Sequence, residues 1–166
     1  DVSFTVEKGE LVGNIGHIEL AKKYGFVIHG DYRLNIYNNS SMFSYDEMES
    51  VIVSPELTLA QIRDIRGSKS VVVYGKVPLM TLERKTGQKI LCDRKRVAFP
   101  VLREGGREIV LNSFPVFMGD KEDMLKKNGI FDRHFIFTTE SKEEVLNIIK
   151  AYKEKKTIKG DVKRIK

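Results

Sequence analysis

Short, continuous runs of apolar residues alternate with amphipathic segments along most of the chain, and this alternation constrains the fold most strongly. Four such runs in the first half of the sequence end near residues 14, 29, 53 and 74. A continuous apolar run is typical of a strand that is buried on both faces, as in a parallel sheet covered by helices. The pattern therefore predicts an α/β fold built from strand–helix repeats.

Helix signals stand between these runs. The segment 58–66 has Thr58 at a capping position and apolar residues at helical spacing. The segment from Ser141 to about residue 155 opens with a capping box, because Glu144 follows Ser141 by three residues. Weaker patterns predict further helices at 18–24, 40–49 and 121–128.

The strand–helix rhythm stops between residues 76 and 108. Turn residues at 85–88 and 104–107 separate short apolar segments, which predicts antiparallel strands. A complete (β/α)₈ barrel needs about 250 residues, and a GxGxxG dinucleotide fingerprint is absent. The sequence therefore predicts the C-terminal portion of a TIM-type (β/α) barrel. This domain is expected to span residues 1–155, with a β-rich insertion at about 76–108 and a basic tail at 156–166.

The amino-acid composition indicates the cellular compartment in which the protein is expected. The single cysteine, Cys92, excludes an internal disulfide and suits a reducing environment. No stretch approaches the ~18 apolar residues of a membrane span, and no signal peptide pattern is present. We therefore expect a cytoplasmic protein, a fragment of a longer chain, with no membrane partner and no DNA partner.

The net charge of +6 is concentrated near the C-terminus. Residues 150–166 contain eight basic and two acidic side chains, whereas residues 1–149 contain 21 of each. A basic tail favours contact with RNA phosphates, although a solvated end that maintains solubility is the simpler interpretation.

Polar side chains at the ends of the predicted strands are the candidate site residues, since barrels gather function there. Asp31, Glu56 and Cys92 are the candidate catalytic groups, and the basic neighbours of Cys92 would favour its thiolate. The alternative is that Asp31 forms a turn and Glu56 helps to start a helix. The histidines lack metal-ligand spacing, so no metal site is expected. The candidate substrate-binding residues are Asn14, His29, Asp31, Asn35, Asn38, Glu56, Tyr74 and Arg94.

The order of these strand-end motifs resembles the peptidase U32 family, also called collagenase-like proteases. The resemblance covers roughly residues 10–165 and depends on the series as a whole, because each motif alone is common. The motifs are GNIG at 13–16, HGDYRLNIYN at 29–38, SPELT at 54–58, VYGKVPLM at 73–80, DRK at 93–95, FPV at 99–101 and LNS at 111–113.

This resemblance implies a TIM-type barrel completed by the remainder of the full-length chain. Several members of the family support hydroxylation of tRNA or rRNA bases, or of ubiquinone, with an iron–sulfur cluster held by four cysteines. This sequence departs from them, because Cys92 alone cannot hold such a cluster. We therefore expect no cofactor in this chain.

Three functions follow from the resemblance. The first is hydroxylation of an RNA base, or support of that reaction, with RNA as a partner. The second is a collagenase-like peptidase, a hydrolase, as the family name states; neither a nucleophile–base set nor a metal site is evident for it. The third is a degenerate, non-catalytic partner. For each of these three functions, the fragment alone is expected to be inactive.

Overall fold

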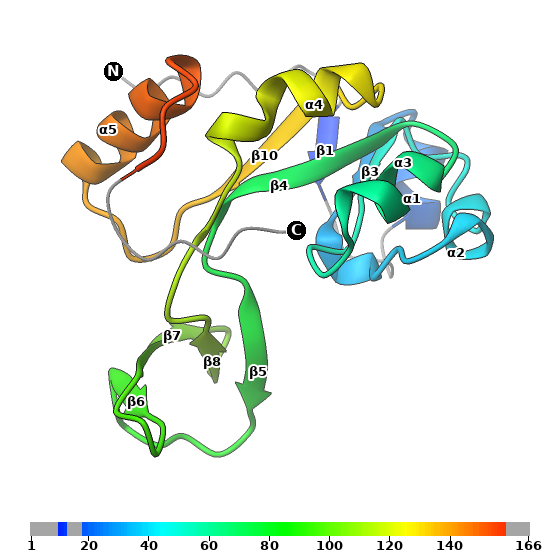
Figure 1. Cartoon of the computed structure of the whole chain (residues 1–166). Helices are drawn as coiled ribbons and strands as arrows, with labels where there is room; N and C mark the ends of the chain where they lie inside the picture. Colours follow the sequence, from blue (N-terminus) through cyan, green and yellow to red (C-terminus); the bar gives the residue numbers. More distant parts are fainter. Residues whose placement is uncertain (1–9, 13–17, 159–166) are drawn as a thin grey trace. The chain divides into compact units, whose positions relative to one another are not determined.

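The computed structural model describes residues 10–12 and 18–158, and Figure 1 shows their path. The helices are α1 (Ile18–Lys23), α2 (Asn39–Phe43), α3 (Leu59–Asp64), α4 (Glu122–Lys127) and α5 (Lys142–Lys153), with 3-10 helices η2 (Tyr32–Leu34) and η3 (Gly119–Lys121). The strands are β1 (Glu10–Val12), β2 (Val27–Gly30), β3 (Ser50–Ile52), β4 (Lys69–Gly75), β5 (Pro78–Leu82), β6 (Ile90–Cys92), β7 (Ala98–Glu104), β8 (Arg107–Leu111), β9 (Val116–Phe117) and β10 (Asp132–Ile136).

These strands form two sheets. The first is mixed and has the order β1-β2-β3-β4-β10, with β9 also paired to β4. Strands β1 to β4 pair in parallel, whereas β4 and β9 are antiparallel. The second sheet is antiparallel throughout and has the order β5-β8-β7-β6.

The prediction that this chain forms the C-terminal portion of a TIM-type barrel is wrong. The parallel series ends at β4, because the next four strands pair only with one another in a separate sheet. The chain then returns to the first sheet through β9, which runs antiparallel to β4. A barrel requires parallel strands around its whole circumference, and the described strands do not provide them.

The described chain divides within β4 and β10 into two compact units. The first unit holds the residues up to Val72 together with residues 125–134, and the second holds residues 73–124 and those from Phe135 onward. The first unit is organised around β1 to β3, and its core contains the buried side chains of Ile36, Val51 and Val53. Ile36 forms a parallel bridge with Val53.

The second unit has an aromatic core. Tyr74 from β4 and Phe117 from β9 are 3% and 1% exposed, and Phe137 packs against them. The ring centroids of Tyr74 and Phe137 lie 5.3 Å apart. The rings of Phe135 and Tyr152, the latter from α5, meet edge to face at 5.0 Å. These contacts fix α5 against the strands of its own unit.

The sequence places the helix starts accurately. Thr58 caps α3 and Ser141 caps α5, each in a capping box with the residue three positions later. In α5 the Ser141 hydroxyl accepts a hydrogen bond from the Glu144 amide at 3.3 Å, and the Glu144 carboxylate accepts one from the Ser141 amide at 2.7 Å. Two amides at the start of the helix thus have partners.

Candidate functional site

Most of the sequence-predicted site residues lie in the first unit, where several have local structural roles. Asn38 accepts a hydrogen bond from the Ser41 amide at 2.9 Å and caps α2. Asn35 follows η2 in the left-handed conformation, with φ of 55°. The Tyr37 hydroxyl donates to the exposed carboxylate of Glu56. Asn14 lies outside the described residues.

The remaining first-unit candidates are His29 and Asp31, at the end of β2. The His29 ring Nδ1 lies 2.8 Å from the Ser50 hydroxyl. Asp31 forms a weak ion pair with Arg33, at 3.7 Å between Oδ2 and Nε. The charge of Asp31 also acts on His134, an imidazole whose pKa is lowered mainly by burial and raised in part by that carboxylate. Within the part of the chain that the structure describes, Asp31 pairs with Arg33 and Glu56 with Tyr37, and no hydrogen bond joins Asp31 and Glu56, although the two were expected to approach a common ligand.

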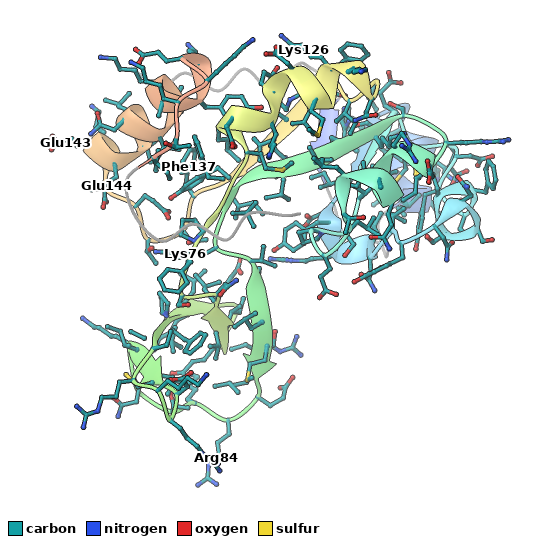
Figure 2. All side chains as sticks on the ribbon, in the orientation of Figure 1. Lys76, Arg84, Lys126, Phe137, Glu143 and Glu144 are labelled. Atoms are coloured by element: carbon teal, nitrogen blue, oxygen red, sulfur yellow. The ribbon has the colours of Figure 1, made fainter. Side chains whose placement is uncertain are left out.

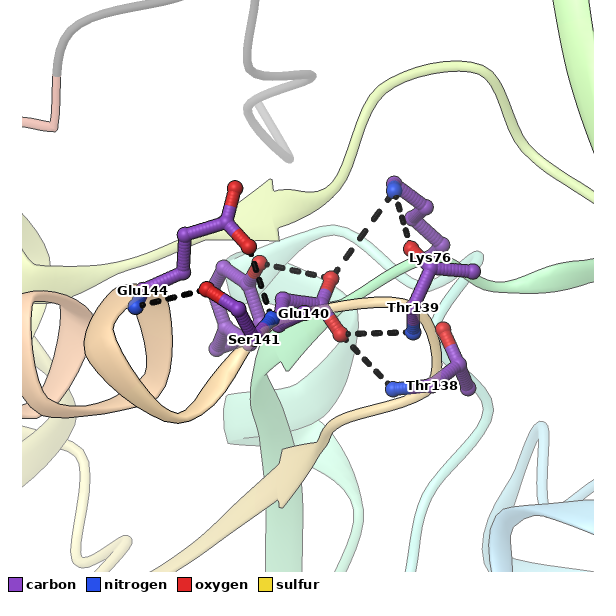
Figure 3. A network of polar contacts seen from close by, with 7 residues as sticks. Lys76, Thr138, Thr139, Glu140, Ser141 and Glu144 are labelled. Atoms are coloured by element: carbon purple, nitrogen blue, oxygen red, sulfur yellow. Dashed lines mark hydrogen bonds and ion pairs between the residues drawn. The ribbon is translucent and has the colours of Figure 1, made fainter.

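A polar network centred on Glu140 lies in the second unit (Figure 3). It includes Tyr74, which is one of three sequence-predicted candidates in this unit, together with Cys92 and Arg94. The Tyr74 hydroxyl donates to Glu140 Oε1 at 2.9 Å. The amides of Thr138 and Thr139 donate to Glu140 Oε2 at 2.7 and 3.0 Å. The Lys76 ammonium lies 3.9 Å from Glu140 and donates to the Thr139 hydroxyl at 2.6 Å.

These contacts fix the protonation of both central groups. The Glu140 side chain is 5% exposed, and burial acts to raise its pKa. Hydrogen bonds from the Thr138 amide and the Tyr74 hydroxyl outweigh burial and hold the pKa below its usual range. Burial and the adjacent Glu140 raise the pKa of Tyr74. Glu140 therefore stays ionised and Tyr74 protonated near neutral pH, so the pair is unsuited to exchanging a proton.

A cavity of about 610 Å³ opens beside this network, entirely within the second unit. Its lining combines apolar side chains such as Pro115 and Ile148 with the charged groups of Lys76, Glu140 and Glu144. The full lining is Tyr74, Lys76, Pro115, Thr139, Glu140, Glu144, Asn147, Ile148, Ala151, Thr157 and Ile158. Most polar groups of the network bond to one another, but the buried Thr138 hydroxyl has no hydrogen-bond partner among the described residues. The network therefore mainly braces the segment between β10 and α5.

Basic side chains gather in the antiparallel sheet of the second unit. Residues 76–111 contain nine basic and four acidic side chains, a net charge of +5, whereas residues 1–75 and 112–149 together contain 12 basic and 17 acidic. Two of the nine form ion pairs within the sheet, Arg103 with Glu108 and Arg107 with Glu83. The positive charge of the protein is therefore not confined to its C-terminal tail.

Six of these basic side chains are exposed and have no ion-pair partner among the described residues. Three belong to the β5–β6 loop and three to the β6–β7 turn. They are Arg84, Lys85 and Lys89 in the loop and Arg94, Lys95 and Arg96 in the turn. Figure 2 shows the Arg84 side chain extending away from the ribbon.

Both connections are held in place by a carboxylate. Glu108 of β8 is fully buried and accepts from the Thr86 amide and hydroxyl, each at 2.7 Å, and from the Gly87 amide at 3.2 Å. The Thr86 amide is the main reason that the pKa of Glu108 is lowered. In the β6–β7 turn, Asp93 Oδ1 accepts from the amides of Lys95 and Val97 at 2.8 and 2.9 Å. The basic side chains therefore project from connections with a defined backbone.

Cys92, the candidate nucleophile, is an exposed free thiol on β6. Arg94 lies two residues later in the turn braced by Asp93. Among residues 10–12 and 18–158, no group of three or more His, Cys, Asp or Glu side chains is arranged to hold a metal ion. No helix in the same residues is long and apolar enough to cross a membrane.

Comparison of the chain with family models, curated proteins and solved structures finds no match.

Proposed function

We propose that this chain is the RNA-binding part of a protein that modifies RNA bases, and that it contributes binding in place of chemistry. One observation carries the proposal: two braced connections of one small sheet hold six exposed basic side chains that form no ion pair with any residue of 10–12 or 18–158. Unpaired lysine and arginine side chains on one element are the electrostatic signature of a nucleic-acid contact.

The bracing distinguishes these connections from an ordinary solvated surface. A basic side chain on a mobile loop loses conformational freedom when it binds a phosphate, which weakens the interaction. Arg96 adopts φ of 61°, a conformation that is unfavourable for arginine and is maintained by the Asp93 turn. Backbone held in this way keeps Arg94, Lys95 and Arg96 together on one turn.

The resemblance to the peptidase U32 family is a second support, because several relatives act on RNA bases. The buried Tyr74–Glu140 pair supports a binding role in a different way. Its protonation states are fixed near neutral pH, so it offers no general acid or base. The proposed division is that this chain holds RNA and that the reacting groups lie elsewhere in the full protein.

The test is fluorescence anisotropy of labelled tRNA with the 166-residue chain and two triple variants. The first is Arg94→Gln/Lys95→Gln/Arg96→Asn, in which asparagine suits the left-handed backbone at position 96. The second removes the same charge from exposed, unpaired positions of the first unit: Lys23→Gln/Arg66→Gln/Lys127→Gln.

The first variant is expected to weaken tRNA binding about 10-fold or more at low salt, because three phosphate contacts are lost. The control variant is expected to bind almost as well as the native chain. If the two variants weaken tRNA binding equally, the loss of affinity is an effect of net charge alone, and the proposed site is refuted. Failure of the native chain to bind tRNA would refute the function.

A further inference from the structure

The two faces of the antiparallel sheet differ in what covers them. Register places Met80, Val101 and Val110 level with one another, and Thr81, Leu102 and Ile109 one step further along. Because side chains alternate along a strand, these two sets lie on opposite faces. On the first face Val110 is buried and Glu108, two residues away, anchors the β5–β6 loop through Thr86 and Gly87, whereas Met80 on the edge strand β5 is 55% exposed.

The opposite face, which we call the open face, has an apolar centre of Ile90, Pro100, Leu102 and Ile109 beside Thr81. By the same alternation it carries Cys92 and Ala98 at one end and Glu104 and Arg107 at the other. Ile90 pairs with Pro100, which is two residues from Leu102 and therefore shares its face. Ile90 is 55% exposed, and the side chains of Pro100, Leu102 and Ile109 are all partly exposed. The β5–β6 loop is held by Glu108, whose side chain belongs to the other face.

Basic groups stand at both ends of the sheet that carries the open face. Arg94, Lys95 and Arg96 adjoin the start of β7, while Arg84 and Lys85 follow β5 at the end where Leu82 pairs with Glu108. Strand β7 has seven residues, so the two groups are separated by roughly 20 Å at about 3.3 Å per residue. The sheet thus presents an apolar strip with positive charge at each end.

We propose that the open face binds single-stranded RNA, with bases against the apolar strip and phosphates against the two basic groups. This inference rests on the proposed RNA-binding function and specifies its substrate. A duplex turns its bases inward and presents sugars and phosphates, which gain nothing from an apolar strip. An unpaired strand exposes base faces that pack on apolar and aromatic side chains while its backbone follows positive charge.

The test compares two fluorescent probes with the 166-residue chain: an oligouridylate of about 12 nucleotides and an RNA duplex of about 12 base pairs. The variant Ile90→Ser/Leu102→Thr removes apolar surface from the open face and leaves every charge in place. The control Leu20→Ser removes a side chain of similar exposure, 52%, from α1. Circular dichroism melts establish that each variant is folded.

The native chain is expected to bind the single strand more tightly than the duplex. Ile90→Ser/Leu102→Thr should weaken the single-strand complex by about 5-fold or more and leave duplex binding unchanged, since only base packing is removed. Leu20→Ser should change neither complex. Duplex binding equal to or tighter than single-strand binding, or a single-strand affinity unaffected by the open-face variant, would overturn this inference and leave RNA binding standing. Weak binding of both probes would overturn RNA binding itself.

Discussion

At the scale of single residues, Glu140 is the side chain on which the second unit depends most. Its carboxylate joins the Tyr74 hydroxyl to the amides of Thr138 and Thr139, just before α5 begins. A buried carboxylate with these partners stabilises the fold, and removing its charge weakens every bond that it accepts. The sequence pattern predicted Tyr74 as a strand-end residue but gave no signal for Glu140, because the two partners are 66 residues apart.

Glu140→Gln should therefore lower the free energy of unfolding by about 1–3 kcal/mol. Glutamine keeps the size of the side chain but loses the charge that three donors share. Urea unfolding at pH 7 measures the effect, with the exposed neighbour Glu143→Gln as the control. A loss no greater than that of Glu143→Gln would contradict the bracing role.

His134 makes stability depend on pH. Burial lowers its pKa in the folded state, so the unfolded chain takes up a proton more readily. Stability is therefore present above the ordinary imidazole pKa of about 6.5 and is lost as the pH falls below it. His134→Gln should show a smaller loss of unfolding free energy between about pH 7 and 5 than the native chain. Parallel profiles for the two proteins would contradict this assignment.

At the scale of elements, the β5–β6 loop depends on one buried carboxylate from a different strand. Glu108 holds Thr86 and Gly87, and Arg84 and Lys85 stand beside them. Glu108→Ala should release the loop and speed tryptic cleavage after Arg84 or Lys85, because proteases cut mobile loops. Glu104→Ala, at the exposed end of β7, is the control. Mass spectrometry of the digests measures the rate of cleavage at these two sites. Equal rates in Glu108→Ala and Glu104→Ala would show that Glu108 does not fix the loop.

Sequence patterns located most of the elements. Apolar runs predicted β2, β3 and β4, the capping residue Thr58 placed the start of α3, and a capping box placed the start of α5. The pattern missed β5, whose residues Leu79 and Met80 are exposed and show no alternation. The sequence pattern also did not predict which strands pair with one another. Pairing of β9 with β4 brings together residues more than 40 positions apart, and local periodicity carries no signal for it.

At the scale of the whole molecule, the barrel prediction failed for a related reason. Alternating strands and helices indicate parallel pairing locally, but barrel closure requires that every strand find two parallel neighbours. The chain instead devotes residues 78–111 to a separate antiparallel sheet. The net positive charge of that sheet can be counted directly from the sequence. Counting charges over the expected insertion, and not only over the tail, would have revealed the basic connections.

The basic connections carry the central claim, and the salt dependence of RNA binding tests it most directly. Each phosphate contact adds about 0.7–0.9 to the magnitude of the slope of log affinity against log salt. For single-stranded RNA between about 50 and 200 mM salt, Arg94→Gln/Lys95→Gln/Arg96→Asn should reduce that magnitude by about 2. A slope equal to that of the native chain would show that these side chains do not contact phosphates and would contradict the account.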